Sequence, residues 1–424
     1  MGQDLFVIAV VVFGFGLVSG RLEGTVITPP MAYVTAGIVL GSAGLGLLDL
    51  GLSQEGVRLL AEATLVIVLF SDASRIDLRV LRRRHQLPVR LLGIGLPLCI
   101  AAGGGLALLL FAGLEIWEAM LVGAILAPTD AALGQVVVTS RAVPVRIRQA
   151  LNVESGLNDG IVLPVITLFL ALAAVDEDLK SASFWAEFVA RQIGFGLLVG
   201  AGIGLAGAWL INRAVAADRI DGLYRQLGTL AVGVAAFGGA EVAEGNGFIA
   251  AFTAGLAMGT IARGPCEDII DFSEDEGQLL ALVTFLVFGA TIAGPALDEL
   301  TWEIAAYAVL SLTVVRMVPV AVSLVGAHLR GDTIAFLGWF GPRGLASILF
   351  GLLVLEEAEL TNGPEIYLIV TWTVLLSVFA HGITAAPLSN RYGARLDSGR
   401  GEMDSDDDMM SEDHPVPELP TRHT

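Results

Sequence analysis

The sequence predicts an all-α polytopic membrane protein with about 13 transmembrane helices, arranged as two inverted six-helix repeats with interrupted crossing helices. Of the 424 residues, 55% are apolar and only 16% are charged, which is more apolar than an ordinary soluble domain. Apolar stretches such as 5–18, 59–70 and 193–211 recur along the chain, and many extend to the roughly 20 residues that cross a bilayer. Because the strict alternation of a barrel strand is missing, these stretches are expected to be helices, which satisfy their own backbone hydrogen bonds.

Each expected helix is an apolar stretch between polar or charged segments. The first has no basic segment before it and no small-residue cleavage site after it, so it predicts a retained helix rather than a signal peptide. The expected spans are 4–20, 31–48, 56–72, 88–112, 117–139, 147–174, 184–212, 222–242, 246–262, 277–294, 302–328, 332–356 and 364–388. Residues 1–396 are thus predicted to form one transmembrane domain, and 397–424 a disordered acidic tail with too little apolar surface to fold.

Charge excludes some functions and predicts an orientation. The net charge of -19 excludes a basic footprint for nucleic acid. Cys99 and Cys266 lie far apart in sequence and suggest neither a disulfide framework nor a metal site. Arginines concentrate in the loops after odd-numbered spans, the largest group being 79–84, which we expect to anchor the chain to anionic membrane lipid on the cytoplasmic face. The N-terminus is therefore predicted outside and the C-terminus in the cytoplasm.

Two spans carry a proline among polar residues in the middle of an apolar stretch. Span 5 contains Ala-Pro-Thr-Asp at 127–130, and span 12 contains Gly-Pro-Arg-Gly at 341–344. If span 7 is a linker, six spans precede it and six follow it with inverted topology, and the two runs occupy equivalent positions. Proline removes a backbone donor and disfavours helix in the preceding residue, although a single proline in a membrane helix is usually only a kink. Paired interruptions in corresponding halves point to the binding site of a transporter.

Ionisable residues inside the spans are few, and each costs roughly 2.5–3.5 kcal/mol on insertion scales. They concentrate in span 6, where Glu154 and Asn158, and likewise Ser155 and Asp159, are one helical turn apart. Ser155 and Asp159 could offer oxygen atoms to one hard cation such as Na+, and span 5 adds Thr129 and Asp130.

Such a group of oxygen atoms can exchange a cation for a proton. Burial favours the protonated form of a carboxylate, whereas a bound cation favours the charged form, so the two ligands compete. We expect Asp159 to be the competing carboxylate and Asp130 its supporting partner. A simpler interpretation of Asp130, after Pro-Thr, is that it caps a half-helix. Glu154 and Arg343 are remaining buried opposite charges, and we expect an ion pair between them with a structural role.

The runs 129–130, 154–159 and 341–344, together with His-Gly-Ile-Thr-Ala at 381–385, resemble the monovalent cation/proton antiporter superfamily, in its NhaP and NHE-like branch. The resemblance covers all thirteen spans and implies a homodimer in the plasma membrane, with core helices in 88–174 and 302–388 and dimerisation helices in 4–48 and 184–262. It implies transport of Na+ or Li+ and of H+, without a cofactor or an organic substrate. Because electrogenic relatives carry Asp-Asp where this chain has Asn158-Asp159, it also implies electroneutral exchange.

Carried over by position, the implied ion ligands are Asp159, Asp130, Ser155 and Thr129, with Asp72 as an additional ligand where some members carry glutamate. Asn158 is expected to organise the site by a hydrogen bond across the crossing, and His381 to be a satisfied interfacial histidine or a pH sensor.

Three other functions stay open at this point. Oxygen donors alone do not fix ion size, so K+/H+ exchange is the nearest alternative. An intramembrane aspartyl protease also needs two embedded aspartates, but Asp159 follows Gly-Leu-Asn at 156–158 rather than the Gly-x-Gly of those enzymes. A passive cation channel would conduct without counter-transport. The sequence therefore favours a secondary transporter over an enzyme.

Overall fold

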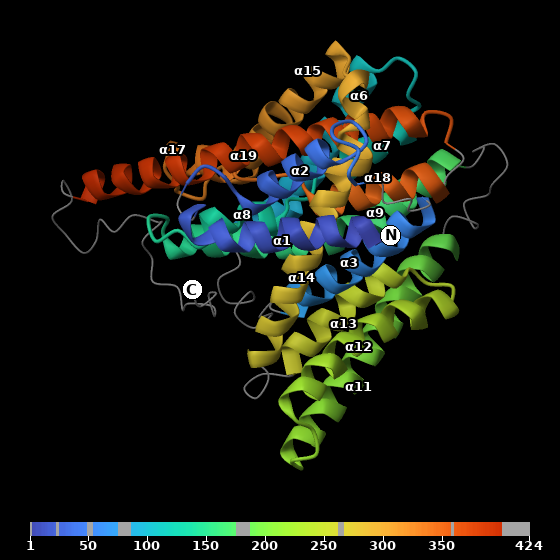
Figure 1. Cartoon of the computed structure of the whole chain (residues 1–424). Coiled ribbons are helices and arrows are strands. Elements are labelled where there is room, and N and C mark those ends of the chain that lie inside the picture. Colours follow the sequence, from blue (N-terminus) through green and yellow to red (C-terminus); the bar gives the residue numbers. More distant parts are fainter. Residues whose placement is uncertain are drawn as a thin grey trace. The chain divides into compact units, whose positions relative to one another are not determined.

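The computed structural model describes residues 2–22, 25–48, 54–74, 86–174, 187–261, 267–357 and 360–400. Across these ranges the regular structure is helical, without strands, as the apolar pattern predicts (Figure 1). The arginine cluster at 79–84 and the tail from 401 onward lie outside the described residues. The last helix runs through Arg400, so the first four residues of the predicted tail are helical.

Six helices within the described ranges are long and apolar enough to cross a membrane. Four shorter apolar helices accompany them, among them Pro29–Leu40 and Ile116–Ile125. The total of thirteen spans and the inverted repeat stay predictions. The six long helices are Gly2–Leu22, Gln86–Leu110, Val145–Ala174, Glu187–Ala216, Trp302–Ser323 and Gly363–Leu396.

The chain divides into two units. Unit 1 comprises Met1–Val57, Gln86–Ser155 and Leu282–Thr424, and unit 2 comprises Arg58–His85 and Gly156–Ala281. This division groups the first two predicted spans with the predicted core helices. The assignment of core and dimerisation helices stays a prediction, because contacts alone do not report which helices move or pair.

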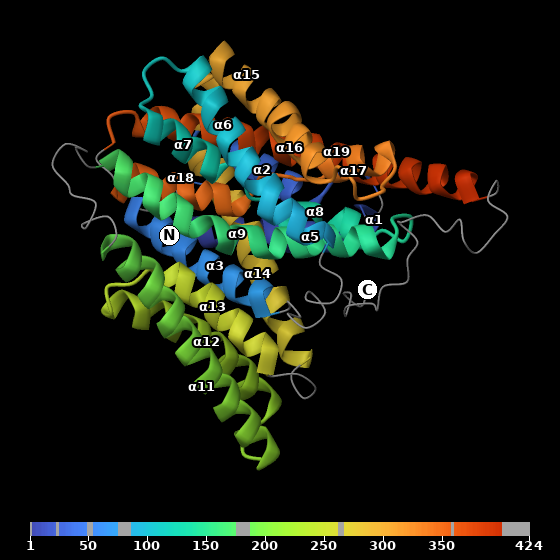
Figure 2. The same ribbon diagram turned by 180° about the vertical axis from the view of Figure 1, so that it is seen from behind.

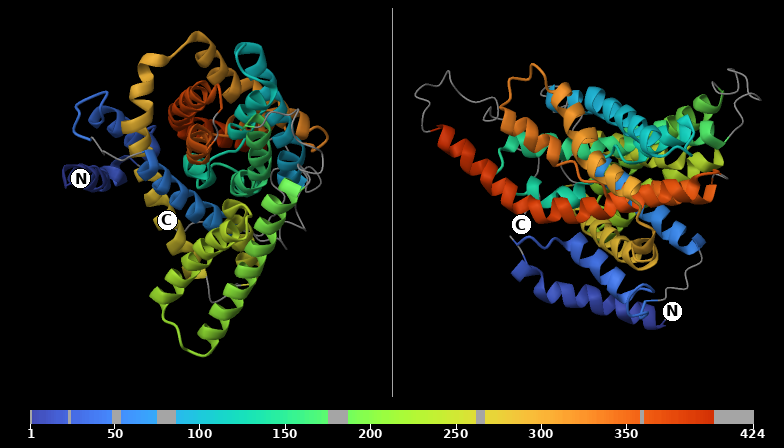
Figure 3. Two further views of the ribbon diagram at one scale, coloured as in Figure 1. Left: turned by 90° about the vertical axis from the view of Figure 1, so that its right-hand side faces the viewer. Right: turned by 90° about the horizontal axis from the view of Figure 1, so that it is seen from above.

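Unit 1 contains α19 (Gly363–Arg400), which packs most extensively against three other helices. These are α8 (Ala131–Val138), α15 (Trp302–Leu310) and α18 (Leu345–Glu357). Figure 3 shows α19 as the long red helix. The unit also contains α1 (Gly2–Leu22), α2 (Pro29–Leu40), α5 (Gln86–Arg90), α6 (Leu96–Leu110), α7 (Ile116–Ile125), the first part of α9 (Val145–Ala174), α16 (Arg316–Ser323) and α17 (Gly331–Trp339), with π-helical turns at Leu91–Gly95, Gly289–Ala293 and Ser311–Val315.

Unit 2 is built on small residues. Helices α11 (Gly196–Ala216), α12 (Gly222–Val242) and α13 (Gly247–Ile261) pack side by side (Figure 2). Gly200 and Gly204 face the backbone of Ala250 and Ala254 so closely that an added Cβ would clash. Such close backbone approach is typical of helices in lipid, where van der Waals contact drives association. Unit 2 also holds most of α3 (Gln54–Ser74), the second part of α9 and the first part of α14 (Glu267–Phe288).

Both predicted interruptions are present in unit 1. Helix α7 ends at Ile125 and α8 begins at Ala131, while α17 ends at Trp339 and α18 begins at Leu345. The prolines of the two runs lie in these breaks, where neither residue has to donate a helical hydrogen bond. The 126–130 and 340–344 segments therefore leave backbone groups that other residues must satisfy.

Candidate functional site

The two broken segments touch. The backbone N–H of Asp130 donates to the carbonyl of Pro342 across 2.8 Å, although the residues are far apart in sequence. This contact joins the two interruptions into one crossing inside unit 1.

The carboxylate of Asp130 caps two half-helices at this crossing. Its Oδ1 accepts the N–H of Leu133 in α8 at 2.9 Å, and its Oδ2 accepts the N–H of Leu345 in α18 at 2.7 Å. Helix N-termini expose unpaired N–H donors and a partial positive charge. A carboxylate accepts hydrogen bonds from these donors and is stabilised by this charge. Gly344 is required here, because a Cβ would occupy the place of the Asp130 carboxylate. The capping interpretation of Asp130 is thus confirmed, and its role as an ion ligand stays a prediction.

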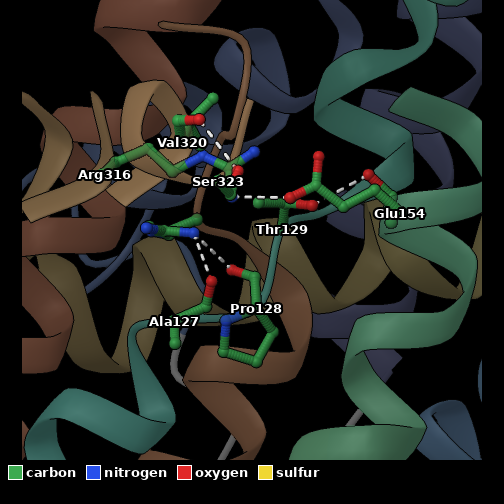
Figure 4. Close-up of polar contacts among 9 residues, drawn as sticks. Ala127, Pro128, Thr129, Glu154, Arg316, Val320 and Ser323 are labelled. Carbon is green, nitrogen blue, oxygen red and sulfur yellow. Dashed lines mark hydrogen bonds and ion pairs between the residues drawn. The ribbon is translucent and has the colours of Figure 1, made fainter. Parts of the chain in front are cut away.

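The C-terminal end of α7 is completed by side chains from the second break and from the start of α18. Arg343 donates from Nη1 to the carbonyls of Ala127 at 2.6 Å and Pro128 at 3.0 Å. Figure 4 labels the two residues whose carbonyls accept these bonds. The hydroxyl of Ser347 donates to the carbonyl of Ile125 at 2.8 Å. A cation suits the C-terminal end of a helix, where the unpaired carbonyls carry partial negative charge.

The predicted ion pair between Glu154 and Arg343 is wrong, because Glu154 pairs with Arg316. Arg316 Nη1 lies 2.6 Å from Glu154 Oε1, and only 2% and 3% of the two side chains is exposed. Arg316 comes from the start of α16, directly after the π-helical turn Ser311–Val315, and Figure 4 shows it pointing toward Glu154. Arg343 is engaged instead by the α7 carbonyls. Gly341 leaves room for this arrangement, since a Cβ there would meet the Arg316 guanidinium.

Helix α19 holds the second break. The backbone N–H of Arg343 donates to Ser377 Oγ at 2.6 Å, and that hydroxyl lies 3.1 Å from His381 Nδ1. His381 Nε2 lies 2.9 Å from the carbonyl of Trp339, the last residue of α17. His381 is therefore satisfied, as one of the two interpretations of the sequence expects, and its side chain is buried, with 1% exposure.

The first break also contacts α9. Thr129 Oγ1 and Ser155 Oγ lie 2.9 Å apart, within hydrogen-bonding distance. The two hydroxyls predicted as ion ligands are thus adjacent. Asn158 and Asp159 are both buried and lie further along α9, in the part that belongs to unit 2. Asp159 follows Ser155 by one helical turn, which places the two side chains on the same face of the helix.

Asp72, the predicted additional ligand, is half-buried in the last turn of α3 and belongs to unit 2. Its role in ion binding stays a prediction. In the described ranges no group of three or more His, Cys, Asp and Glu side chains forms a metal cluster. The oxygen donors available to a cation near the crossing are hydroxyls, backbone carbonyls and single carboxylates, which suit a hard ion of low charge.

Three residues that complete the site carry no functional role in the sequence interpretation: Arg316, Ser347 and Ser377. The sequence signal for Arg316 is its position as the second arginine inside an apolar span, which requires a partner. The two serines have no signal, because serine is common in membrane helices and their partners are backbone groups of distant segments.

Two interrupted helices that meet at buried charges are typical of ion-coupled secondary transporters. Sequence comparison places the chain within that class. The profile of the family described as "Sodium/hydrogen exchanger, transmembrane" matches residues 7–391. The chain belongs to this family of monovalent cation/proton antiporters, in its NhaP and NHE-like branch, and is a multi-pass membrane protein.

The curated relatives are named as antiporters of two different cations, K+ and Na+. The chain is 26% identical over 368 residues to the "K(+)/H(+) antiporter NhaP2" of Shewanella baltica, covering 85% of this chain and 62% of the relative. It is 27% identical over 376 residues to the "Na(+)/H(+) antiporter ApNhaP" of Aphanothece halophytica, covering 84% of this chain and 69% of the relative. The chain thus spans less than two thirds of the length of NhaP2.

The fold is that of a solved antiporter. The structure of the sodium proton antiporter MjNhaP1 from Methanocaldococcus jannaschii at pH 8 matches with a TM-score of 0.73 and 18% identity, covering 93% of this chain and 98% of that one. An electron-microscopy map of the same protein matches with a TM-score of 0.75 and 18% identity, covering 96% and 99%. At this identity the likeness concerns the fold.

Proposed function

We propose that this protein exchanges Na+ for H+ by alternating access, one for one, with Asp159 as the carboxylate for which the two ions compete. The observation that carries the proposal is the contact between Thr129 and Ser155, which joins the first helix break to α9 one turn before Asp159. Thr129 and Ser155 supply hydroxyl oxygens, and Asp159 supplies the charge that either ion neutralises.

Competition at one carboxylate accounts for coupling. A bound cation stabilises the charged carboxylate, and a bound proton removes that charge, so the two forms exclude each other. With neither ion bound, the carboxylate keeps its charge inside the protein, and moving a buried charge across the barrier is costly. The loaded forms therefore carry the cation one way and the proton the other, and slippage without exchange is suppressed.

The partners of the two other acidic side chains near the crossing support this assignment. Arg316 neutralises Glu154, and the carboxylate of Asp130 receives two helix N-termini. Asp130 then contributes mainly by fixing the crossing, and Thr129 precedes it directly in the chain. Asn158, in place of a second aspartate, leaves a single exchanged charge and supports electroneutral exchange.

Exchange of K+ for H+ is a second candidate, favoured by the names of the NhaP2 relatives. Hydroxyl and carboxylate oxygens bind both ions, and selection between them depends on the size and rigidity of the site. The same competition at Asp159 would apply.

We further propose that the protein works as a homodimer in the cell membrane, with its N-terminus outside and its C-terminus in the cytoplasm. The excess of arginine after odd-numbered spans supports this orientation. The small-residue packing of α11, α12 and α13 supports a rigid unit that could serve as the dimer contact.

The test is ion flux in proteoliposomes containing a pH-sensitive dye. Gradients of Na+, Li+ and K+ are applied in turn at several pH values, with and without a clamped membrane potential. Na+-driven proton movement that is independent of the potential supports the proposal. Movement driven only by K+ supports the second candidate. Dissipation of the Na+ gradient without proton movement would indicate a channel and refute both.

A further inference from the structure

A small pocket lies beside the Thr129–Ser155 contact, entirely within unit 1. Its interior has room for roughly one water molecule. A hydrated cation therefore has to lose most of its water to enter.

The walls of the pocket differ in polarity. On one side stand Val137 and Val138 of α8, with Phe340 from the second break. On the other side stand Asn152 and Ser155 of α9. These two polar residues are three positions apart on a helix and share a face. Asn152 is exposed, whereas Ser155 is half-buried and contacts Thr129. The polar wall thus leads from an exposed side chain to the proposed ion ligands.

Gly134 determines the width of this pocket. It lines the pocket from α8, and a Cβ added at this position would meet no other atom within 4 Å. By contrast, Gly123 on α7 is in direct contact with the backbone of α6, so a side chain there would clash. The space in front of Gly134 is instead open, so a larger side chain there would enter it without a clash at Cβ.

We propose that this pocket is the vestibule through which the cation reaches Thr129 and Ser155, that Asn152 is an additional ligand on this route, and that Gly134 keeps the route open. The inference rests on the proposed cation/proton exchange. A neutral amide oxygen replaces part of the lost hydration without holding the ion tightly, as a transit site requires. The apolar wall opposite offers the ion no competing ligand.

The first experiment narrows the vestibule in steps. Gly134→Ala, Gly134→Val and Gly134→Leu are compared with Gly105→Leu, a control on α6 whose added Cβ also meets no atom within 4 Å but which does not line the pocket. We expect cation-driven proton flux in the Gly134 variants to fall as side-chain volume increases, by about tenfold or more for Gly134→Leu. The melting temperatures of the Gly134 variants should stay equal to that of the control. Equal flux in Gly134→Leu and Gly105→Leu would overturn the inference.

The second experiment tests Asn152 as a ligand. Asn152→Ala should raise the KM for Na+ by about threefold to tenfold, since one ligand is lost, while kcat stays within about twofold. Asn152→Asp should lower this KM, because a negative charge holds the cation more strongly. An unchanged KM in both variants would exclude Asn152 from the route.

A third readout does not depend on transport. In Asn152→Cys, the rate of alkylation by N-ethylmaleimide is followed by mass spectrometry of the peptide that contains residue 152, so the native cysteines can stay. Na+ should slow alkylation and choline at the same ionic strength should not, and Gly134→Leu should slow it without Na+. Alkylation rates that change neither with Na+ nor in Gly134→Leu would overturn the inference. If the wild type exchanges no cation for protons, the proposed function fails; if it exchanges normally and only these effects are missing, the vestibule alone is refuted.

Discussion

The two helix interruptions are completed by each other but are held by different surroundings. At the first break, the carbonyls of Ala127 and Pro128 accept hydrogen bonds from Arg343, which belongs to the second break. At the second break, the N–H of Leu345 donates to Asp130, which belongs to the first. Neither break can therefore satisfy its backbone without the other, and the crossing forms as one element.

The difference lies in what each break contacts beyond the crossing. The first reaches Ser155 on α9 through the hydroxyl of Thr129. The second is tied to Ser377 and His381 on α19 by three successive contacts. We infer that the first break faces the ion and the second anchors the crossing. Substitutions on the α9 side should then change exchange, and substitutions around Arg343 should mainly change stability.

The largest effect is expected from Asp159→Asn, which removes the charge for which Na+ and H+ compete. An amide neither releases a proton nor neutralises a cation, so proton flux driven by Na+ should fall to the level of empty liposomes. The melting temperature in detergent should stay close to that of the wild type. Asp221→Asn is the matched control, because this exposed aspartate caps α12 and asparagine caps equally well. If Asp159→Asn retained coupled exchange, the inference that the α9 side of the first break carries ion exchange would be wrong.

The next effect concerns the buried ion pair. Arg316→Met leaves Glu154 charged and unpaired inside unit 1, and the loss of one partner of a buried pair typically costs about 3–5 kcal/mol. The double variant Glu154→Gln/Arg316→Met should lose clearly less than the sum of its single variants, as measured by thermal unfolding in detergent. For the double variant Glu154→Gln/Arg343→Met, the loss of stability should be nearer to the sum of the losses in its single variants. Stronger coupling of Glu154 to Arg343 than to Arg316 would contradict the observed pairing.

The breaks were predictable from the sequence, whereas the partners of their charges were not. Pro128 and Pro342 interrupt apolar spans, and proline restricts the backbone locally, so its effect appears in the sequence itself. The choice of Arg316 over Arg343 as partner of Glu154 depends on which helices face each other. Two buried arginines and one buried glutamate leave that choice open until the packing is known.

The π-helical turns also escaped prediction. Leu91–Gly95 and Ser311–Val315 lie inside predicted spans and carry no proline or charge at the irregular turn. The second of them sets the position of Arg316, so the error in the ion pair and the missed turn concern the same place. Gly341 and Gly344 show the converse: their need for space was unpredictable, because it depends on side chains that arrive from α16 and α8.

A smaller effect distinguishes the two charges of the crossing. Arg343→Ala leaves the carbonyls of Ala127 and Pro128 without their donor, and each orphaned buried group costs about 1–3 kcal/mol. Asp130→Asn keeps one acceptor oxygen for one of its two N–H partners. Arg343→Ala should therefore be less stable than Asp130→Asn by about 2 kcal/mol, as judged from thermal unfolding of both variants in one detergent. The reverse order would mean that the first break, rather than the second, anchors the crossing.

The smallest effect is expected at the hydroxyl of Thr129, through which the first break contacts α9. Thr129→Val keeps the shape of the side chain but removes the oxygen that lies 2.9 Å from Ser155 Oγ, whereas Thr129→Ser keeps the oxygen. Loss of one ligand or hydrogen bond worth about 1 kcal/mol should raise the KM for Na+ in Thr129→Val by about fivefold. The KM of Thr129→Ser should stay within about twofold of the wild type. Because protons compete with the cation, the KM of all three proteins should rise as pH falls. A change in stability without any change in KM would place Thr129 with the anchoring residues and leave Ser155 and Asp159 as the ligands.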